Sequence, residues 1–198
     1  MDANTAKLIR DLMVAECVNS APPPDHVLYR LISMGRLRVL ARGQMLISVG
    51  DFNPHFHILV SGVMRRWHWD GNTEKTSAFA TAGTQTLIYH CYYAGRPSVD
   101  NVEACSPCRI LTVRKPDFDA LLADSPEFAL YNFHMAAADL YFQEMKRDLF
   151  TGNARERYLA LMRNRPEIVK SVSQRILASY LGITPQYLSN IRKEIFNK

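Results

Sequence analysis

The sequence predicts an α+β protein with three parts: an N-terminal antiparallel β jelly roll, a long dimerisation helix and a C-terminal all-α helix-turn-helix domain. Three observations lead to this fold class. Short apolar runs separated by glycines come first, a continuous apolar heptad pattern follows, and a basic segment with helix-turn-helix spacing ends the chain. We place the three parts at residues 1–122, which include an N-terminal helix, at residues 123–152 and at residues 153–198.

The first part begins with an amphipathic helix, because residues 4–18 carry apolar side chains at helical spacing and the prolines at 22–24 end it. From about residue 37 the pattern changes to short apolar runs with glycine-bearing turns, as in an antiparallel sandwich or barrel. Asp70-Gly71 is the clearest hairpin signal. The expected strands cover 37–41, 44–49, 56–60, 63–69, 76–80, 84–89, 98–104 and 109–114.

The second part is a long helix. A short helix from Pro116 to Leu122 precedes it, and Ser125 and Pro126 are residue types that cap and start a helix, which we expect to reach about Thr151. An apolar seam with alternating spacings of three and four favours packing against a second copy; it consists of Phe128, Tyr131, Met135, Ala138, Phe142, Met145 and Leu149. A second stripe is expected to face the chain's own sandwich; it consists of Leu130, Phe133, Ala137 and Leu140. The alternative that both stripes pack within one chain stays open.

Composition and charge exclude several classes of protein. The 198 residues are 47% hydrophobic and 22% charged, and no apolar run reaches the roughly 18 residues of a membrane span. The acidic N-terminus is unlike a secretory signal, so we expect a cytoplasmic protein with reduced thiols. The formal net charge is +5, yet residues 153–198 hold nine Lys or Arg and three Glu, so the basic excess lies at this end. Such asymmetry indicates a polyanionic partner, with a solvated basic surface as the alternative.

The third part carries the pattern of a helix-turn-helix over residues 174–191. Ala178 is the small residue at which the second helix crosses the first, Gly182 tolerates the positive φ of the turn, Thr184 can cap the second helix and Pro185 can start it. Apolar residues that clamp the two helices stand at Leu177, Leu181, Ile183, Leu188 and Ile191. The agreement of all these positions on a basic background predicts DNA binding.

The residues that this packing turns outward are the candidates for DNA contact. Gln186 and Asn190 carry amides that can pair with the N6/N7 edge of adenine, so we expect them to select bases. The cationic and hydroxyl side chains suit phosphates, which set affinity and register. The candidate set is Arg175, Thr184, Pro185, Gln186, Ser189, Asn190, Arg192 and Lys193.

The order of these parts resembles the Crp/Fnr family of bacterial transcription regulators over nearly the whole chain. The resemblance rests on RGQMLISVGD at 42–51 and FHILVSGV at 56–63, on the seam helix, and on ASYLGIT at 178–184. It implies a cyclic-nucleotide-binding-like jelly roll, a homodimer, and duplex DNA as the partner, with RNA polymerase and a small-molecule effector as further candidate partners. Neither a cofactor nor enzymatic activity is expected.

The sequence departs from that family at the effector cassette. The stretch 83–87 reads GTQTL, without the Glu that binds ribose, and 97–101 reads PSVDN, without the Arg that meets the phosphate; Arg96 stands two residues early. We therefore expect no binding of cyclic AMP at physiological levels and leave the effector unknown, with Tyr89, Tyr92 and Tyr93 as candidate contacts for a less charged molecule. The candidate pocket residues are Gly83, Thr84, Gln85, Thr86, Leu87, Arg96, Ser98 and Val99. The chain stops at Lys198, so we expect the family's wing to be short or missing.

Two alternatives stay open. One is an effector-sensing module whose helical tail binds a protein, and the other is a cupin-like metal-binding protein with His55 and His57 on one strand face. A cupin needs a carboxylate shortly after, where Ser61 stands. Cys105 and Cys108 have zinc-like spacing without a second pair, which favours ordinary strand-edge cysteines. We predict no metal site and no catalytic residues.

Overall fold

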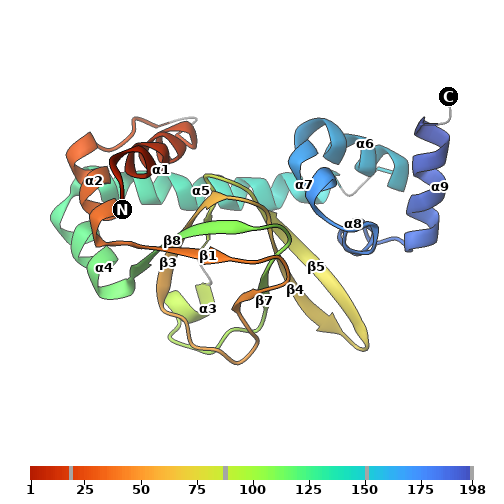
Figure 1. Ribbon diagram of the computed structural model, residues 1–198, viewed down its shortest axis with the longest axis horizontal. Coiled ribbons are helices and arrows are strands. Elements are labelled where there is room, and N and C mark those ends of the chain that lie inside the picture. The colour runs from red at the N-terminus through yellow and green to blue at the C-terminus, as the bar shows by residue number, and fades with distance from the viewer. Residues whose placement is uncertain (18–19, 87–88, 150–151, 197–198) are drawn as a thin grey trace.

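The computed structural model describes residues 1–17, 20–86, 89–149 and 152–196. Two β-sheets form a sandwich (Figure 1). Helices that precede the strands in the sequence and helices that follow them together cover one outer face of this sandwich. A second group of helices lies at the far end of the long helix α5. The mixed architecture, with antiparallel sheets first and helices last, confirms the predicted fold class.

The sandwich consists of two antiparallel sheets with strand orders β1-β8-β3-β6 and β2-β7-β4-β5. The strands are β1 (Arg36–Leu40), β2 (Met45–Ile47), β3 (His55–Ser61), β4 (Met64–Asp70), β5 (Thr73–Ala80), β6 (Gln85–Thr86), β7 (Asn101–Ala104) and β8 (Cys108–Arg114). Each expected strand is found, and Asp70-Gly71 forms the predicted hairpin turn between β4 and β5, with Gly71 at φ 58°. The expectation for 84–89 was too long, because β6 is short and the helix α3 (Tyr89–Tyr92) follows.

Two apolar cores lie on either side of the first sheet. Between the sheets, Leu59 and Ile110 of one sheet pack with Met64 and Val102 of the other. On the outer side, the β3 residues that flank Leu59 in the sequence pack against helices α1 (Ala3–Ala15), α2 (Asp25–Met34), α4 (Lys115–Asp124) and α5 (Pro126–Leu149). The alternation of the β3 side chains between these cores explains why this strand is buried without interruption from Phe56 to Val60.

Helix α2 is an element that the sequence analysis did not anticipate. It starts directly after Pro24 without a side-chain cap, so the proline run read as a connector leads straight into a helix. Its buried residues Val27, Leu28, Leu31 and Ile32 stand at helical spacing and pack into the outer core. The signal was therefore present but short.

The long helix is confirmed, but the first residues of the predicted dimer seam are taken up by the chain's own core. Phe128 and Tyr131, which were expected to meet a second copy, have 0% and 1% of their surface exposed, because they pack in the chain's own core. The Phe128 ring lies 5.4 Å from that of Phe118, and the Tyr131 hydroxyl donates to the carbonyl of Met13. Met135 packs against the same core. Of the remaining seam residues, Ala138 is half-buried, and the side chains of Phe142, Met145 and Leu149 lie outside the described residues.

The second stripe faces solvent instead of the sandwich. Leu130, Phe133 and Leu140 are 58%, 66% and 69% exposed, and Ala137 is exposed between them. Tyr141, beside Leu140, is 56% exposed. We call Leu130, Phe133, Ala137, Leu140 and Tyr141 the exposed stripe of α5.

The last group of helices has its own apolar core. The helices are α6 (Ala154–Asn164), α7 (Pro166–Ser171), α8 (Gln174–Leu181) and α9 (Pro185–Phe196). Asn153 begins α6 with a capping box, in which its side chain accepts from the Glu156 amide and the Glu156 carboxylate accepts from the Asn153 amide. Val63 and Cys105 of the sandwich join this core, so the two groups share buried contacts.

Candidate nucleic-acid interface

Helices α8 and α9 form the turn that the sequence predicted. Gly182 ends α8 at φ 68° and ψ 35°, the left-handed conformation that a side chain would strain. The Thr184 hydroxyl accepts from the Tyr187 amide at 3.2 Å, which makes Thr184 the cap of α9. Ala178, Leu188 and Ile191 are buried between the two helices. The turn glycine, the Thr184 cap and the buried clamp residues together set how α9 leaves α8.

The outer face of α9 presents the expected polar side chains to solvent. Gln186, Asn190 and Lys193 are exposed, and Ser189 and Arg192 are half-buried. The Gln186 amide donates to the Asn190 side-chain oxygen at 3.4 Å, so the two candidate base-selecting amides stand next to each other one helical turn apart. Without DNA the two amides form this long hydrogen bond with each other. The edge of a base would replace it with a pair of hydrogen bonds to each amide.

Tyr187 is a surface residue of α9 that the sequence analysis missed. Its side chain is 51% exposed, next to Gln186 in the first turn of the helix. An aromatic ring with a hydroxyl can contact a thymine methyl group or a phosphate. The signal was available, because the apolar clamp needs only every third or fourth residue and leaves position 187 outside it.

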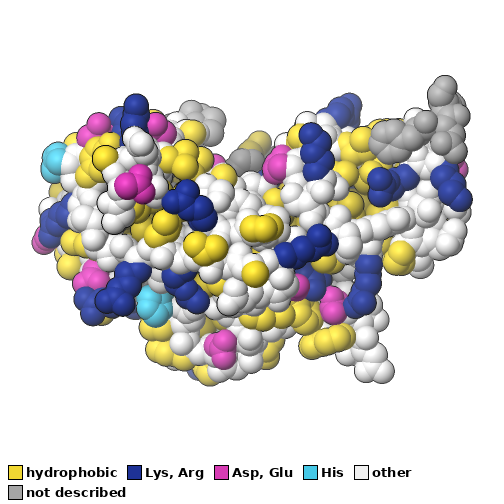
Figure 2. Space-filling model, in the orientation of Figure 1, with side chains coloured by type: hydrophobic (Ala, Val, Ile, Leu, Met, Phe, Trp, Pro, Cys, Tyr) yellow, Lys and Arg dark blue, Asp and Glu magenta, His cyan; other side chains and the backbone are white. Residues whose placement is uncertain are grey.

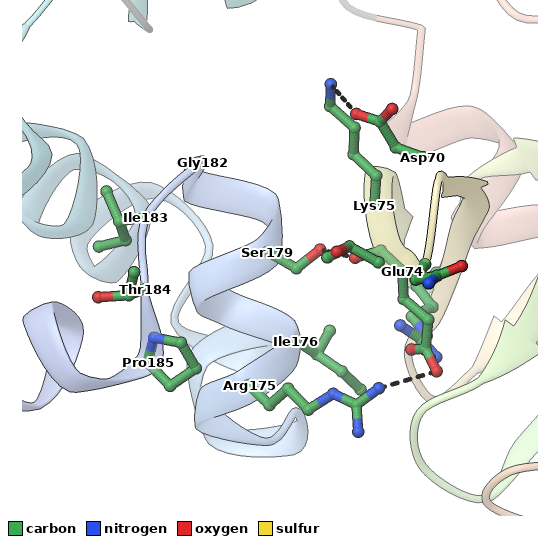
Figure 3. A pocket seen from close by; sticks show the side chains of 13 residues that line it. Asp70, Glu74, Lys75, Arg175, Ile176, Ser179, Gly182, Ile183, Thr184 and Pro185 are labelled. Atoms are coloured by element: carbon green, nitrogen blue, oxygen red, sulfur yellow. Dashed lines mark hydrogen bonds and ion pairs between the residues drawn. The ribbon is translucent and has the colours of Figure 1, made fainter.

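Arg175 at the start of α8 lies opposite the β4–β5 hairpin. Its guanidinium forms an ion pair of 3.0 Å with Glu74 of β5. Between the hairpin and the α8–α9 turn is a cavity of about 580 Å³, which Figure 3 shows from close by. Thr184 and Pro185 also line it. Of the predicted DNA contacts, the structure thus brings Arg175 into contact with the sandwich and leaves the α9 residues free of it.

Lys and Arg side chains are prominent over the C-terminal helices on the face shown in Figure 2. Figure 2 also shows Lys and Arg over the sandwich, but in residues 1–152 Asp and Glu balance them, so the basic excess lies at the C-terminal end. A positive surface around α9 would attract phosphates over several ångströms, and salt would weaken this attraction.

The effector cassette forms a tight turn whose polar groups are satisfied internally. The Thr84 hydroxyl accepts from the Thr81 amide at 3.1 Å, and the Thr84 carbonyl accepts from Leu59. The Gln85 side chain donates to the Tyr131 hydroxyl. Gly83 lies under the carboxylate of Glu16, at a φ of 93°; a Cβ added there would be 2.7 Å from that carboxylate oxygen. An anion placed at this turn would meet the Glu16 carboxylate, and the amides of Gly83 and Thr84 already donate to the carbonyls of Leu59 and Thr81.

The second half of the predicted pocket also lacks the features of a phosphate-binding site. Ser98 is buried, and its hydroxyl donates to the carbonyl of Asp100 at 2.6 Å. Arg96 and Val99 point to solvent. Leu87 and the side chain of Thr86 lie outside the described residues. The structure therefore brings Gly83, Thr84 and Gln85 together in one turn but does not bring Arg96 to them as a buried partner.

Two of the three tyrosines considered as effector contacts, Tyr92 and Tyr93, do not line the space between the sheets. Tyr92 is buried in the outer core, and its hydroxyl donates to Asp119. Tyr93 is 65% exposed. The side chain of Tyr89 lies outside the described residues. The first two are thus poor candidates for an enclosed pocket.

His55 and His57 lie on one face of β3 with ring centroids 6.0 Å apart. His55 Nδ1 contacts the Asn53 side-chain oxygen at 2.6 Å, and His57 Nδ1 contacts the Thr112 hydroxyl at 3.0 Å. Within the part of the chain that the structure describes, His, Cys, Asp and Glu side chains form no group of three or more that could hold a metal ion. Cys91, Cys105 and Cys108 are buried thiols, and burial raises the pKa of Cys105 to about 12.

Among the described residues, no helix is both long enough and apolar enough to cross a membrane.

Comparison with known proteins relates the chain to one domain family and to several solved structures. Residues 37–125 match the family model of the cyclic nucleotide-binding domain. FixK2 from Bradyrhizobium japonicum has 17% sequence identity and a TM-score of 0.69, over 82% of this chain and 85% of that one. CLP from Xanthomonas campestris, a regulator responsive to c-di-GMP, has 13% identity and a TM-score of 0.69, over 87% of this chain and 91% of that one.

A third solved structure, the catabolite activator protein from Thermus thermophilus, has 18% identity and a TM-score of 0.55, over 87% of this chain and 83% of that one. Among curated proteins, no sequence matches significantly. At these identities the solved structures establish the fold. Residues 37–125 thus match the cyclic nucleotide-binding domain family, and the chain shares its fold with FixK2 and the catabolite activator protein, regulators of the Crp/Fnr family that its sequence resembles.

Proposed function

We propose that this protein is a dimeric, sequence-specific DNA-binding regulator of transcription that acts in the bacterial cytoplasm. The observation that carries the proposal is the pairing of a fully formed helix-turn-helix with an outward polar face on α9, in which Gln186 and Asn190 are exposed side by side. The regulators that share the fold support the same role. RNA polymerase is a further partner in this proposal, which includes no enzymatic activity.

Selection from a pool of random duplexes, followed by gel shift, tests DNA binding. Gln186→Ala and Asn190→Ala should each relax the preference at one base pair and cost about 1–3 kcal/mol there. Arg192→Ala should weaken binding to all duplexes alike and flatten the salt dependence, because a phosphate contact carries no sequence information. If the wild-type chain enriches no sequence and binds no duplex, the function proposed is wrong, and a protein-docking tail takes its place.

The dimer in this proposal forms through the exposed stripe of α5. Leu130, Phe133, Ala137 and Leu140 repeat with spacings of three and four, which is the pattern of a coiled-coil seam. A contiguous row of large apolar side chains that are more than half exposed indicates a surface meant to be covered. An isologous contact of two such helices would cover it in both copies at once.

The jelly roll in this proposal does not bind cyclic AMP. A bound cyclic nucleotide would need a cation or free amides for its phosphate and an acceptor for its ribose hydroxyl. The turn at Gly83 offers the Glu16 carboxylate instead, and Ser98 is engaged with Asp100. Isothermal titration with cyclic AMP and with cyclic GMP should show no binding at micromolar concentration; a micromolar dissociation constant, about −8 kcal/mol, would contradict this part of the proposal.

A further inference from the structure

The inference concerns how α8 sits on the sandwich. Among the described strands, β5 lies at the edge of its sheet, so one side of its backbone has no strand partner there. Ser179 of α8 fills that place: its hydroxyl accepts from the Thr76 amide at 2.9 Å and donates to the Glu74 carbonyl at 2.7 Å. One side chain thereby satisfies a donor and an acceptor on the strand edge, as a neighbouring strand would do.

Glu74 ties the same strand to the first helix of the DNA-binding motif. One of its carboxylate oxygens pairs with Arg65 at 2.9 Å and the other with Arg175 at 3.0 Å. Arg65 is only 5% exposed and also pairs with Glu103 at 2.6 Å, so its position is fixed by burial. Arg65 thus fixes one oxygen of the Glu74 carboxylate, and the other oxygen pairs with Arg175, as Figure 3 shows.

The contact continues to the other end of β5. The rings of Phe79 and Tyr180 are 4.8 Å apart, and Arg165 donates to the Thr81 hydroxyl at 2.8 Å. Thr81 in turn accepts from the amide of Thr84 in the cassette turn. The group of helices α6–α9 therefore contacts the edge strand β5 along its whole length, next to the turn that carries the cassette.

The charges in this contact oppose those of a DNA complex. Arg175 stands beside the start of α9, where the backbone of a duplex would pass, and it is 71% exposed, yet its charge is already paired. A phosphate would have to compete with the Glu74 carboxylate for this cation and would approach that carboxylate at the same time. Docking and phosphate binding thus use the same side chain.

We propose that the contact of α8 with β5 is an autoinhibitory latch: Glu74 and Ser179 hold the helix-turn-helix against the sandwich, and DNA binding requires that the Glu74–Arg175 pair open. The latch rests on the proposed function, because it regulates that same site. Its place beside the cassette turn lets a change at residues 81–85 release it.

Two substitutions test the latch by different means. Glu74→Gln removes the charge, and Arg65 keeps Glu103 as its partner. Affinity for random-sequence duplexes should rise about fivefold or more, and the log–log salt slope should steepen by about 0.9, because Arg175 becomes available to one more phosphate. The double variant Glu74→Gln with Arg175→Ala should lose the steeper slope. Ser179→Ala leaves the charge unchanged and should also raise the affinity.

The matched control is Asp70→Asn. This change removes one negative charge from the same hairpin, but Asp70 pairs with Lys75 instead of Arg175. It should therefore change affinity far less than Glu74→Gln. Amide hydrogen exchange gives a reading without DNA: the Thr76 amide should be protected in the wild type and lose protection in Ser179→Ala.

The outcomes separate this inference from the function it rests on. If the wild type binds duplexes and Glu74→Gln behaves like Asp70→Asn, the latch is wrong and DNA binding stands. If Glu74→Gln binds random-sequence duplexes about fivefold or more tightly than the wild type and Asp70→Asn does not, the latch is supported. If neither protein binds any duplex, both proposals fall.

Discussion

His57 is an ionisable side chain placed where its charge cannot be solvated. It is 1% exposed, its Nδ1 lies against the Thr112 hydroxyl, and burial lowers its pKa to about 3, with His55 and Arg38 contributing. In the folded protein the ring is therefore neutral at pH values at which an unfolded histidine takes up a proton. Such an imidazole contributes to the acid sensitivity of the fold.

The direction of this effect follows from the lowered pKa. Between pH 6.5 and about 3 the unfolded chain binds a proton at this site that the folded chain does not, so the contribution is full above pH 6.5 and is lost as the pH falls. The loss approaches about 1.4 kcal/mol per pH unit below 6.5. The free energy of unfolding of the wild type should therefore fall more steeply from pH 7 to pH 5 than that of His57→Gln. His26→Gln, at an exposed position, is the control and should retain the wild-type slope.

Single residues also mark how far the sequence predicts the site. Gly182, Thr184 and Pro185 could be assigned because each acts through local backbone geometry, and the structure has them in those roles. The contact of Ser179 with the edge of β5 joins residues about a hundred positions apart, so no local pattern announces it. In the sequence, nothing distinguishes Glu74 from other charged residues of a hairpin strand.

At the scale of elements, the heptad pattern of α5 predicts a helix but not its orientation. Both apolar stripes of this helix repeat with spacings of three and four, so either could face a second copy. Which stripe is buried depends on α1, α2 and α4, which cover the outer core and take up Phe128 and Tyr131. Helix α2 was itself unanticipated, so the surface that decides the question was missing from the sequence-based picture.

The two stripes should respond differently to the same substitution. Phe128→Ala should cost the monomer about 3–5 kcal/mol of stability, because it empties a buried ring position. Phe133→Ala, at a position that is 66% exposed, should cost the monomer about 0.5 kcal/mol or less. Phe133→Glu should instead separate the dimer, since it sets like charges against each other across the two-fold axis.

Sedimentation and thermal unfolding measure the two effects. A folded Phe133→Glu monomer beside a wild-type dimer would support the exposed stripe as the dimer contact. If Phe133→Glu sediments as the wild type does at micromolar concentration, the stripe has another role.

At the scale of the whole molecule, the excess positive charge lies outside the sandwich. The basic excess lies beyond residue 153, and the helices there carry the exposed polar face of α9. Sequence alone predicted this arrangement, because charge, helix caps and the turn glycine all lie within one short segment. The docking of that segment on β5 needed the structure, because it joins residues about a hundred positions apart.

A dimer with one such helix per copy should bind two inverted half-sites. Because both recognition helices must enter the major groove on the same side of the duplex, the half-site centres should lie about one helical turn, roughly 10 base pairs, apart. Inserting about five base pairs between the half-sites turns one of them to the opposite face of the duplex and should remove most of the affinity. Inserting about ten restores the face of the duplex and should recover part of the affinity. Gel shifts on these three duplexes measure the effect, and Phe133→Glu, which should bind single half-sites weakly, should be indifferent to the insertions. If the wild type binds all three duplexes equally well, the two helix-turn-helix units do not act as a rigid pair.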